Sequence, residues 1–179
     1  MDFYSVFIFL FSFIPFLLQK FSKKFIYFAM ASIIVIVLHG VYLFGLNILF
    51  LFSITYIVSS IAELVSLKTP INCFGVKYKY NLKHKFFSSK INILGVYPLE
   101  ISFAWILLKY ISFIIAVIIS AAFNLSPIWR IILTPFILVS IDFIVDPIAV
   151  NYSNLWQWGE SSFYFGIPIR NFLGWYLVG

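Results

Sequence analysis

The sequence is poor in charge: charged residues make up only 10% of its 179 positions, against 63% for hydrophobic residues. An ordinary soluble domain is about half apolar and about a quarter charged, and a chain of this length cannot bury such an excess in one core. Lipid is therefore the natural solvent, and an ordinary water-soluble domain is excluded. The net charge of +6 comes mostly from lysines in or beside short loops, which indicates membrane orientation rather than nucleic-acid binding.

Cysteine and histidine are also scarce. The single cysteine, Cys73, excludes an internal disulfide and a cysteine-based metal cluster. The two histidines, His39 and His84, are isolated, unlike the repeated histidine ligands of a di-iron oxygenase. No GxGxxG motif follows an expected strand, as a tightly held flavin or nicotinamide would require. We therefore expect neither a metal nor an organic cofactor.

What the sequence has in abundance is long apolar runs. Residues 3–18 lack the basic start and the cleavage site of a signal peptide, so we interpret them as a transmembrane helix. The later runs have about 20 residues or more, enough to cross a hydrocarbon core of about 30 Å. We predict an all-α, polytopic bundle forming one membrane domain over residues 1–179, with five full spans at residues 3–18, 25–44, 46–67, 96–122 and 128–150.

A short apolar tail, residues 171–179, follows the last predicted loop. Nine residues of helix rise only about 14 Å, half a bilayer. We expect this tail to be either the first part of a sixth helix or an interfacial segment.

The lysines set the predicted orientation. They gather in two stretches, residues 20–24 and 68–90, which two expected spans separate. Both stretches therefore lie on one side of the membrane, and the positive-inside rule makes that side cytoplasmic. We predict a multi-pass protein of the cell membrane with its N-terminus outside.

Carboxyl groups are few, and this topology places nearly all of them toward the cytoplasmic side. Asp142 and Asp146 are four residues apart, so they share one helix face. Two close carboxylates resist ionising together, so one tends to keep a proton, as acid–base catalysis requires. Glu63 continues a polar line on its own helix, and such lines face other helices rather than lipid. Buried carboxyl groups of this kind usually mark a functional cavity, although capping of helix ends remains an alternative.

Aromatic residues are numerous near the same side. Most would fit an interfacial belt. The alternative is that some line a pocket whose ring faces stabilise a carbocation. The sequence leaves both interpretations open.

Two stretches carry a family resemblance. The first contains F-G-x-x-Y-x-Y and G-V-x-P, at residues 74–80 and 95–98, followed by Trp105. The second contains D-x-x-x-D-P at residues 142–147, then W-x-W at 156–158 and G-I-P-x-x-N-F-x-G-W at 166–175. Together, over roughly residues 60–179, they resemble the membrane carotenoid-biosynthesis hydratases, of the bisanhydrobacterioruberin hydratase and carotenoid 1,2-hydratase type.

The resemblance implies addition of water to the terminal double bond of an acyclic carotenoid, giving a tertiary alcohol. It implies Asp142 or Asp146 as the acid and Glu63 as the group that positions water, with no cofactor. The lipid-soluble carotenoid would enter from the bilayer. The substrate-binding residues that it implies are Phe74, Tyr78, Tyr80, Trp105, Trp156, Trp158, Asn171 and Trp175.

Other functions stay open at this point. A carotenoid cyclase would share the protonation step and then lose a proton instead of adding water. A membrane prenyltransferase would use Asp142 and Asp146 to hold Mg²⁺ and a diphosphate. A membrane scaffold or transporter subunit would use its polar helix faces for packing or conduction. The oligomeric state is not predicted.

Overall fold

The computed structural model describes residues 25–87 and 91–179, and these residues are mostly helical. The expected span at residues 3–18 lies outside them. The long helices are α3 (Phe25–Phe44), α4 (Ile48–Lys68), α5 (Leu99–Ala122) and α6 (Ile128–Pro147), and a shorter helix, α7 (Ile169–Val178), follows. A 3-10 turn, η1 (Gly45–Asn47), joins α3 to α4, and a π-helical turn, η2 (Ile148–Tyr152), extends α6.

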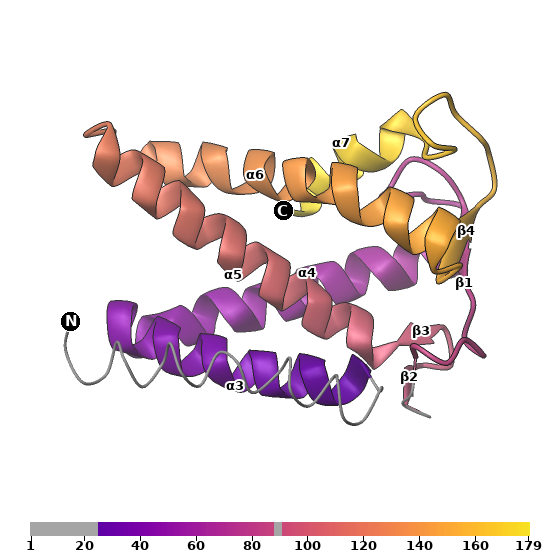
Figure 1. Ribbon diagram of the computed structural model, residues 1–179, viewed down its shortest axis with the longest axis horizontal. Coiled ribbons are helices and arrows are strands. Elements are labelled where there is room, and N and C mark those ends of the chain that lie inside the picture. The colour runs from indigo at the N-terminus through magenta and orange to yellow at the C-terminus, as the bar shows by residue number, and fades with distance from the viewer. Residues whose placement is uncertain (1–24, 88–90) are drawn as a thin grey trace.

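The helices form a bundle with α5 at its centre. α5 contacts α3 and α4 on one side and α6 on the other, while α7 packs along α6 (Figure 1). The turn between α3 and α4 contains Gly45 at φ 66°, a left-handed conformation that glycine adopts at little cost. The chain therefore folds back, and α3 and α4 lie beside each other.

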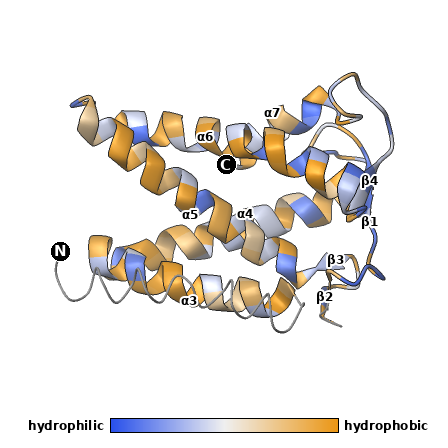
Figure 2. Ribbon diagram, viewed as in Figure 1, coloured by the Kyte–Doolittle hydropathy of each residue, from blue (hydrophilic) through white to orange (hydrophobic). Residues whose placement is uncertain are grey.

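Among the described residues, three helical stretches are long and apolar enough to cross a membrane: residues 25–68, which include α3 and α4, residues 99–122 and residues 128–152. Many large apolar side chains on these helices are exposed on the outside of the bundle, which is the pattern expected against lipid. Hydrophilic residues gather at the end of the bundle that carries the strands (Figure 2). The structure thus agrees with a helical membrane protein, while the five spans and the outside N-terminus stay predictions.

Four short strands were missed by the all-α prediction. β1 (Tyr78–Tyr80) pairs antiparallel with β4 (Trp156–Trp158), and β2 (Asn92–Ile93) pairs with β3 (Tyr97–Pro98). All four lie at one end of the bundle (Figure 1). Strands of two or three residues are too short for periodicity to reveal, and the pairing of β1 with β4 joins segments far apart in the chain.

The segment after α4 is tied down by polar contacts that satisfy the helix end. Thr69 Oγ1 donates to the carbonyl of Val65 at 2.8 Å, and the Lys77 ammonium donates to the carbonyls of Ser66 and Thr69. The last carbonyls of a helix need such donors. These contacts fix the path of the chain into β1.

The predicted short tail forms α7, and α7 belongs to the packed interior. Asn171, Phe172 and Gly174 are buried, and α7 contacts both α6 and α4. A side chain at Gly174 would collide with the backbone of Cys73 and Phe74. Glycine at this position therefore lets α7 lie directly against the segment that leads into β1.

Candidate functional site

Glu63 lies near the end of α4, is only 3% exposed and accepts hydrogen bonds from three side chains. Tyr78 donates from β1 at 2.5 Å, and the Tyr80 hydroxyl lies 3.1 Å from each carboxyl oxygen. The indole nitrogen of Trp105, on α5, donates at 3.1 Å. A buried carboxyl group is costly unless it is hydrogen-bonded, and here three donors from two elements compensate for its burial.

Strand geometry explains why two tyrosines reach one carboxyl group. Tyr78 and Tyr80 are two residues apart, so their side chains lie on the same face of β1. Burial raises the pKa of both phenols, and the neighbouring Glu63 raises the pKa of each further. Both hydroxyl groups therefore keep their protons and remain donors to Glu63.

A second polar cluster joins α6 to α7. Asp142 and Asp146 lie one turn apart on α6 and are 0% and 1% exposed. Between them, the side-chain amide nitrogen of Asn171 donates to Asp142 Oδ2 at 3.1 Å and to Asp146 Oδ2 at 2.6 Å. Helix α7 thus supplies one amide group that holds both aspartates in place.

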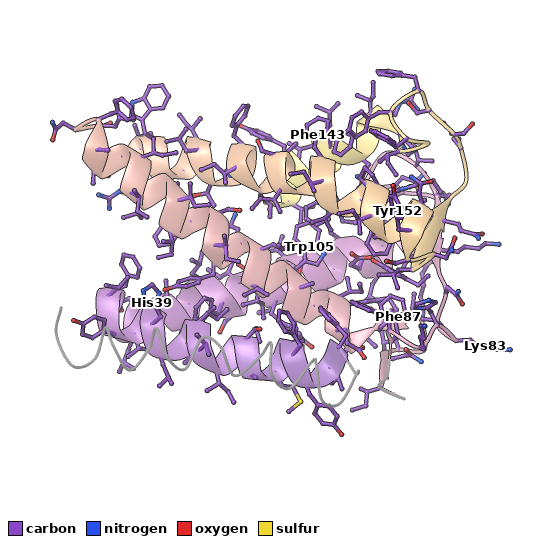
Figure 3. The ribbon with its side chains drawn as sticks, in the orientation of Figure 1. His39, Lys83, Phe87, Trp105, Phe143 and Tyr152 are labelled. Carbon is purple, nitrogen blue, oxygen red and sulfur yellow. The ribbon has the colours of Figure 1, made fainter. Side chains whose placement is uncertain are left out.

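A cavity of about 70 Å³ lies between these two clusters, large enough for a few water molecules. Its walls come from α4, β1, α5, α6, β4 and α7, and Figure 3 shows Trp105 in the interior among these helices. It is lined by Glu63, Phe74, Tyr78, Tyr80, Ile101, Ala104, Trp105, Leu108, Val145, Asp146, Trp156, Trp158, Asn171 and Trp175. Two carboxyl groups therefore face one small, mostly aromatic space.

The aromatic wall is built by stacking and by strand pairing. Trp105 stacks on Trp175 with ring centroids 4.2 Å apart. The register of β1 and β4 places Tyr78 opposite Trp158 and Tyr80 opposite Trp156, with ring centroids 5.1 Å and 5.8 Å apart. Aromatic faces attract positive charge, so such a wall can stabilise a cationic intermediate.

The structure brings together nearly all of the residues predicted for the site. All eight residues implied as substrate-binding line the cavity, together with Glu63 and Asp146. Asp142 is not among the lining residues, and it accepts a hydrogen bond from Asn171, which does line the cavity. The two aspartates thus differ in position, which the sequence left open.

Four apolar lining residues were not predicted: Ile101, Ala104, Leu108 and Val145. The first three are spaced three and four residues apart on α5, so they share one helix face. The same face carries Trp105, and this spacing was the signal that could have identified them. The signal for Val145 was weaker, because it consists only of its position next to Asp146 in the sequence.

The described residues contain no group of three or more histidine, cysteine, aspartate or glutamate side chains that could hold a metal ion. Asp142 and Asp146 are the nearest approach to such a group. The amide nitrogen of Asn171, a donor, points at both carboxyl groups, where Mg²⁺ would need oxygen ligands.

The sequence was compared with models of known protein families. The sequence profile of a family described as "Carotenoid biosynthesis protein" matches residues 24–179. The chain belongs to this carotenoid biosynthesis family. No curated protein and no solved structure gives a significant match. Family membership supports a role in carotenoid biosynthesis for this membrane protein, and the match includes every residue that lines the cavity.

Proposed function

We propose that this protein is a carotenoid hydratase, which adds water to the terminal double bond of an acyclic carotenoid to form a tertiary alcohol. The observation that carries the proposal is the pair of buried carboxyl groups, Glu63 and Asp146, which face one small aromatic cavity. Hydration of an alkene needs an acid, a water-binding base and stabilisation of the cation between the two steps. The cavity holds side chains suited to each task.

Asp146 is the acid in this proposal because it lines the cavity and Asp142 does not. Its carboxyl group gives a proton to the less substituted alkene carbon, and the π bond supplies the electron pair of the new C–H bond. The resulting tertiary cation lies against the aromatic wall, where Trp105 and Trp175 present stacked rings.

Glu63 positions the water that attacks the cation. Water oxygen forms the new C–O bond, and Glu63 accepts the proton that the water loses. A proton then returns from Glu63 to Asp146 through water in the cavity, so the net reaction is alkene plus water to alcohol. Tyr78, Tyr80 and Trp105 hold Glu63 in one orientation for this step.

One orphaned donor favours hydration over cyclisation. The buried indole nitrogen of Trp158 lines the cavity and has no acceptor among the described residues. A water oxygen or a product hydroxyl group would accept this hydrogen bond, whereas a cyclic hydrocarbon product would leave the indole nitrogen unsatisfied. A cyclase is therefore the second candidate.

Two other candidates fit the site less well. A Mg²⁺-dependent prenyltransferase would need the space that the Asn171 amide nitrogen occupies between the aspartates. A scaffold would give no reason for two carboxyl groups around an aromatic cavity, and a transporter subunit would use them for conduction and leave the pigment unchanged. In our proposal the protein has five spans, lies in the cell membrane with its N-terminus outside, and takes its substrate from the bilayer.

The deciding experiment is expression in a host that accumulates an acyclic carotenoid, followed by chromatography and mass measurement of the pigment. We expect a gain of one water, or two if both ends react, that survives EDTA. Asp146→Asn should lower conversion by about 10²–10⁴-fold, the usual contribution of a positioned acid, and Glu63→Gln by a similar factor. Asp142→Asn should cost less, because Asp142 does not line the cavity.

Each other outcome identifies a different function. A product of unchanged mass and altered absorption would indicate a cyclase, and loss of activity with EDTA would indicate metal-dependent chemistry. Unchanged pigment, with the protein present in the membrane, would contradict enzymatic activity on the carotenoid. Full hydration by well-folded Asp146→Asn and Glu63→Gln variants would contradict the assigned roles.

A further inference from the structure

An apolar groove adjoins the cavity. Its volume is about 340 Å³, and five of its lining residues also line the cavity. The shared residues are Ile101, Ala104, Leu108, Val145 and Trp156. The groove and the cavity therefore adjoin each other at these five side chains.

A second groove continues the first. Its volume is about 370 Å³, and it shares Phe28 and Leu107 with the first groove. Together the two grooves, here called the α3/α5 groove, follow one face of each helix. The lining residues of α3 are Phe25, Phe28, Ser32, Val35, Ile36 and His39, and those of α5 are Ile101, Ala104, Leu107, Leu108, Tyr110, Ile111, Ile114 and Ile115.

Helical spacing gives the groove its length. The lining residues of α5 recur every three or four positions from Ile101 to Ile115, which corresponds to about 21 Å of helix rise. The stripe on α3, from Phe25 to His39, has the same rise of about 21 Å. An elongated ligand fits such a groove.

The walls of the α3/α5 groove are apolar enough to contact a hydrocarbon chain. Among residues 25–87 and 91–179, no lysine, arginine, aspartate or glutamate lines either part of the groove. The most polar pair, His39 and Tyr110, is joined by a hydrogen bond of 2.7 Å between His39 Nδ1 and the Tyr110 hydroxyl group. Because these two groups satisfy each other, the ligand need not supply a polar partner for that bond.

We consider this groove as a binding site because it adjoins the cavity, and not because of its size. A larger apolar groove of about 520 Å³ lies between α6 and α7, lined by Val139, Phe143 and Phe172 among others. None of its lining residues lines the cavity. A ligand held there would have no described path to the two carboxyl groups.

We propose that the α3/α5 groove binds the linear isoprenoid chain of the substrate, with the reactive end of that chain in the cavity. This inference rests on the proposed function for the identity of the reactive end. The groove then acts as a ruler, because residues far from the cavity contact only substrates with long chains. Val35 and Ile111, in the second part of the groove, are such residues.

The test compares Val35→Trp with a matched control, Val139→Trp. Both valines are half-buried and line apolar grooves. The groove of Val35 continues one that adjoins the cavity, whereas the groove of Val139 shares no lining residue with the cavity. The substrates are a full-length acyclic carotenoid and a truncated isoprenoid with the same terminal double bond. We expect Val35→Trp to lower the ratio of long-chain to short-chain conversion about tenfold or more, and Val139→Trp to leave that ratio unchanged.

A binding measurement separates this inference from the proposed function. A polyene held in a chiral protein groove acquires circular dichroism in its visible absorption band, and this signal needs no turnover. We expect purified protein to induce the signal in an added acyclic carotenoid, Val35→Trp to lose it and Val139→Trp to keep it. If Val35→Trp does not fold, Ile111→Trp on the opposite wall replaces it in both measurements.

The outcomes distinguish the two claims. An induced signal that Val35→Trp abolishes, without any hydration, would support the groove and overturn the hydratase function. If Val35→Trp still hydrates the substrate, with the same chain-length ratio and the same induced signal as the unmodified protein, the proposal that this groove binds the isoprenoid chain would be contradicted. That second result would mean that something other than the substrate, such as membrane lipid, occupies this face.

Discussion

Glu63 shows at the scale of one residue how this protein keeps a carboxyl group inside an apolar bundle. An unpaired carboxylate there would be very costly, and none of the described residues that line the cavity is a lysine or an arginine that could neutralise it. Hydrogen bonds from Tyr78, Tyr80 and Trp105 take the place of a counter-ion. The same donors also fix where the carboxyl oxygens point.

We predict that Tyr78→Phe removes the shortest of these hydrogen bonds and costs roughly 1.5–3 kcal/mol of unfolding free energy, the usual range for bonds to a charged group. Conversion should fall about 10²-fold at most, because Tyr80 and Trp105 still hold Glu63. Denaturation in detergent and pigment analysis measure the two effects. Tyr27→Phe, at an exposed position on α3, is the control and should change neither quantity. Equal stability of the two variants would contradict the role of Tyr78.

Asn171 is a second residue whose role depends on its neighbours. Its single amide group donates to both aspartates and lines the cavity as well. It thereby links Asp142, which does not line the cavity, to Asp146, which does. The motif containing Asn171 was visible in the sequence, but the amide bridge was not, because the residues lie 29 and 25 positions apart.

At the scale of elements, the pairing of β1 with β4 builds one wall of the cavity. The carbonyl of Lys77 accepts from the Gly159 amide at 2.7 Å, and that of Leu155 accepts from the Asn81 amide at 2.8 Å. Antiparallel ladders alternate between bonded and non-bonded pairs, so Lys79 and Gln157 form the bonded pair between these two.

This ladder leads to a prediction for Gln157. Gln157→Pro removes the amide donor at the middle of β4, so Trp156 and Trp158 should lose their positions and conversion should fall at least tenfold. Gln157→Ala keeps the backbone donor and changes only an exposed side chain, so it should retain activity. Tryptophan fluorescence and pigment analysis check both variants. Equal activity of the proline and alanine variants would mean that strand pairing does not support the cavity.

Helix α7 depends on a close backbone approach at Gly174. A side chain there would meet the backbone of Cys73 and Phe74, so Gly174→Val should push α7 outward together with Asn171 and Trp175. Overpacking of this kind costs about 1–3 kcal/mol, and we expect conversion to fall with stability. Leu173→Ala, at an exposed neighbouring position, should leave both nearly unchanged. Thermal unfolding and pigment analysis of the two variants test this prediction. Full activity of Gly174→Val would contradict the close packing of α7 against Cys73 and Phe74.

At the scale of the whole molecule, the strands, the cavity and most of the polar residues lie toward one end of the bundle (Figures 1 and 2). The predicted orientation places that end at the cytoplasmic face. The α3/α5 groove adjoins the cavity and follows apolar faces of α3 and α5. In the proposed function, the reactive end of the substrate reaches the carboxyl groups of the cavity while the rest of the chain stays in the bilayer.

The orientation has a direct test at Lys83, which is exposed and extends away from the strand end (Figure 3). We predict that Lys83→Cys, in a Cys73→Ser background, reacts with a membrane-impermeant maleimide only after the cells are permeabilised. The control is the Cys73→Ser background alone, which should not react. Labelling of intact cells would reverse the predicted topology and place the site at the outer face.

The sequence by itself determined that this is a membrane protein of mostly helical structure, because hydrophobicity and its spacing are local properties of the chain. It also indicated which carboxyl and aromatic residues belong together, because their motifs resemble those of one enzyme family. It did not determine that Asp146 faces the cavity while Asp142 lies behind Asn171, or that β1 pairs with β4. Those facts depend on contacts between residues distant in the chain, which only tertiary packing decides.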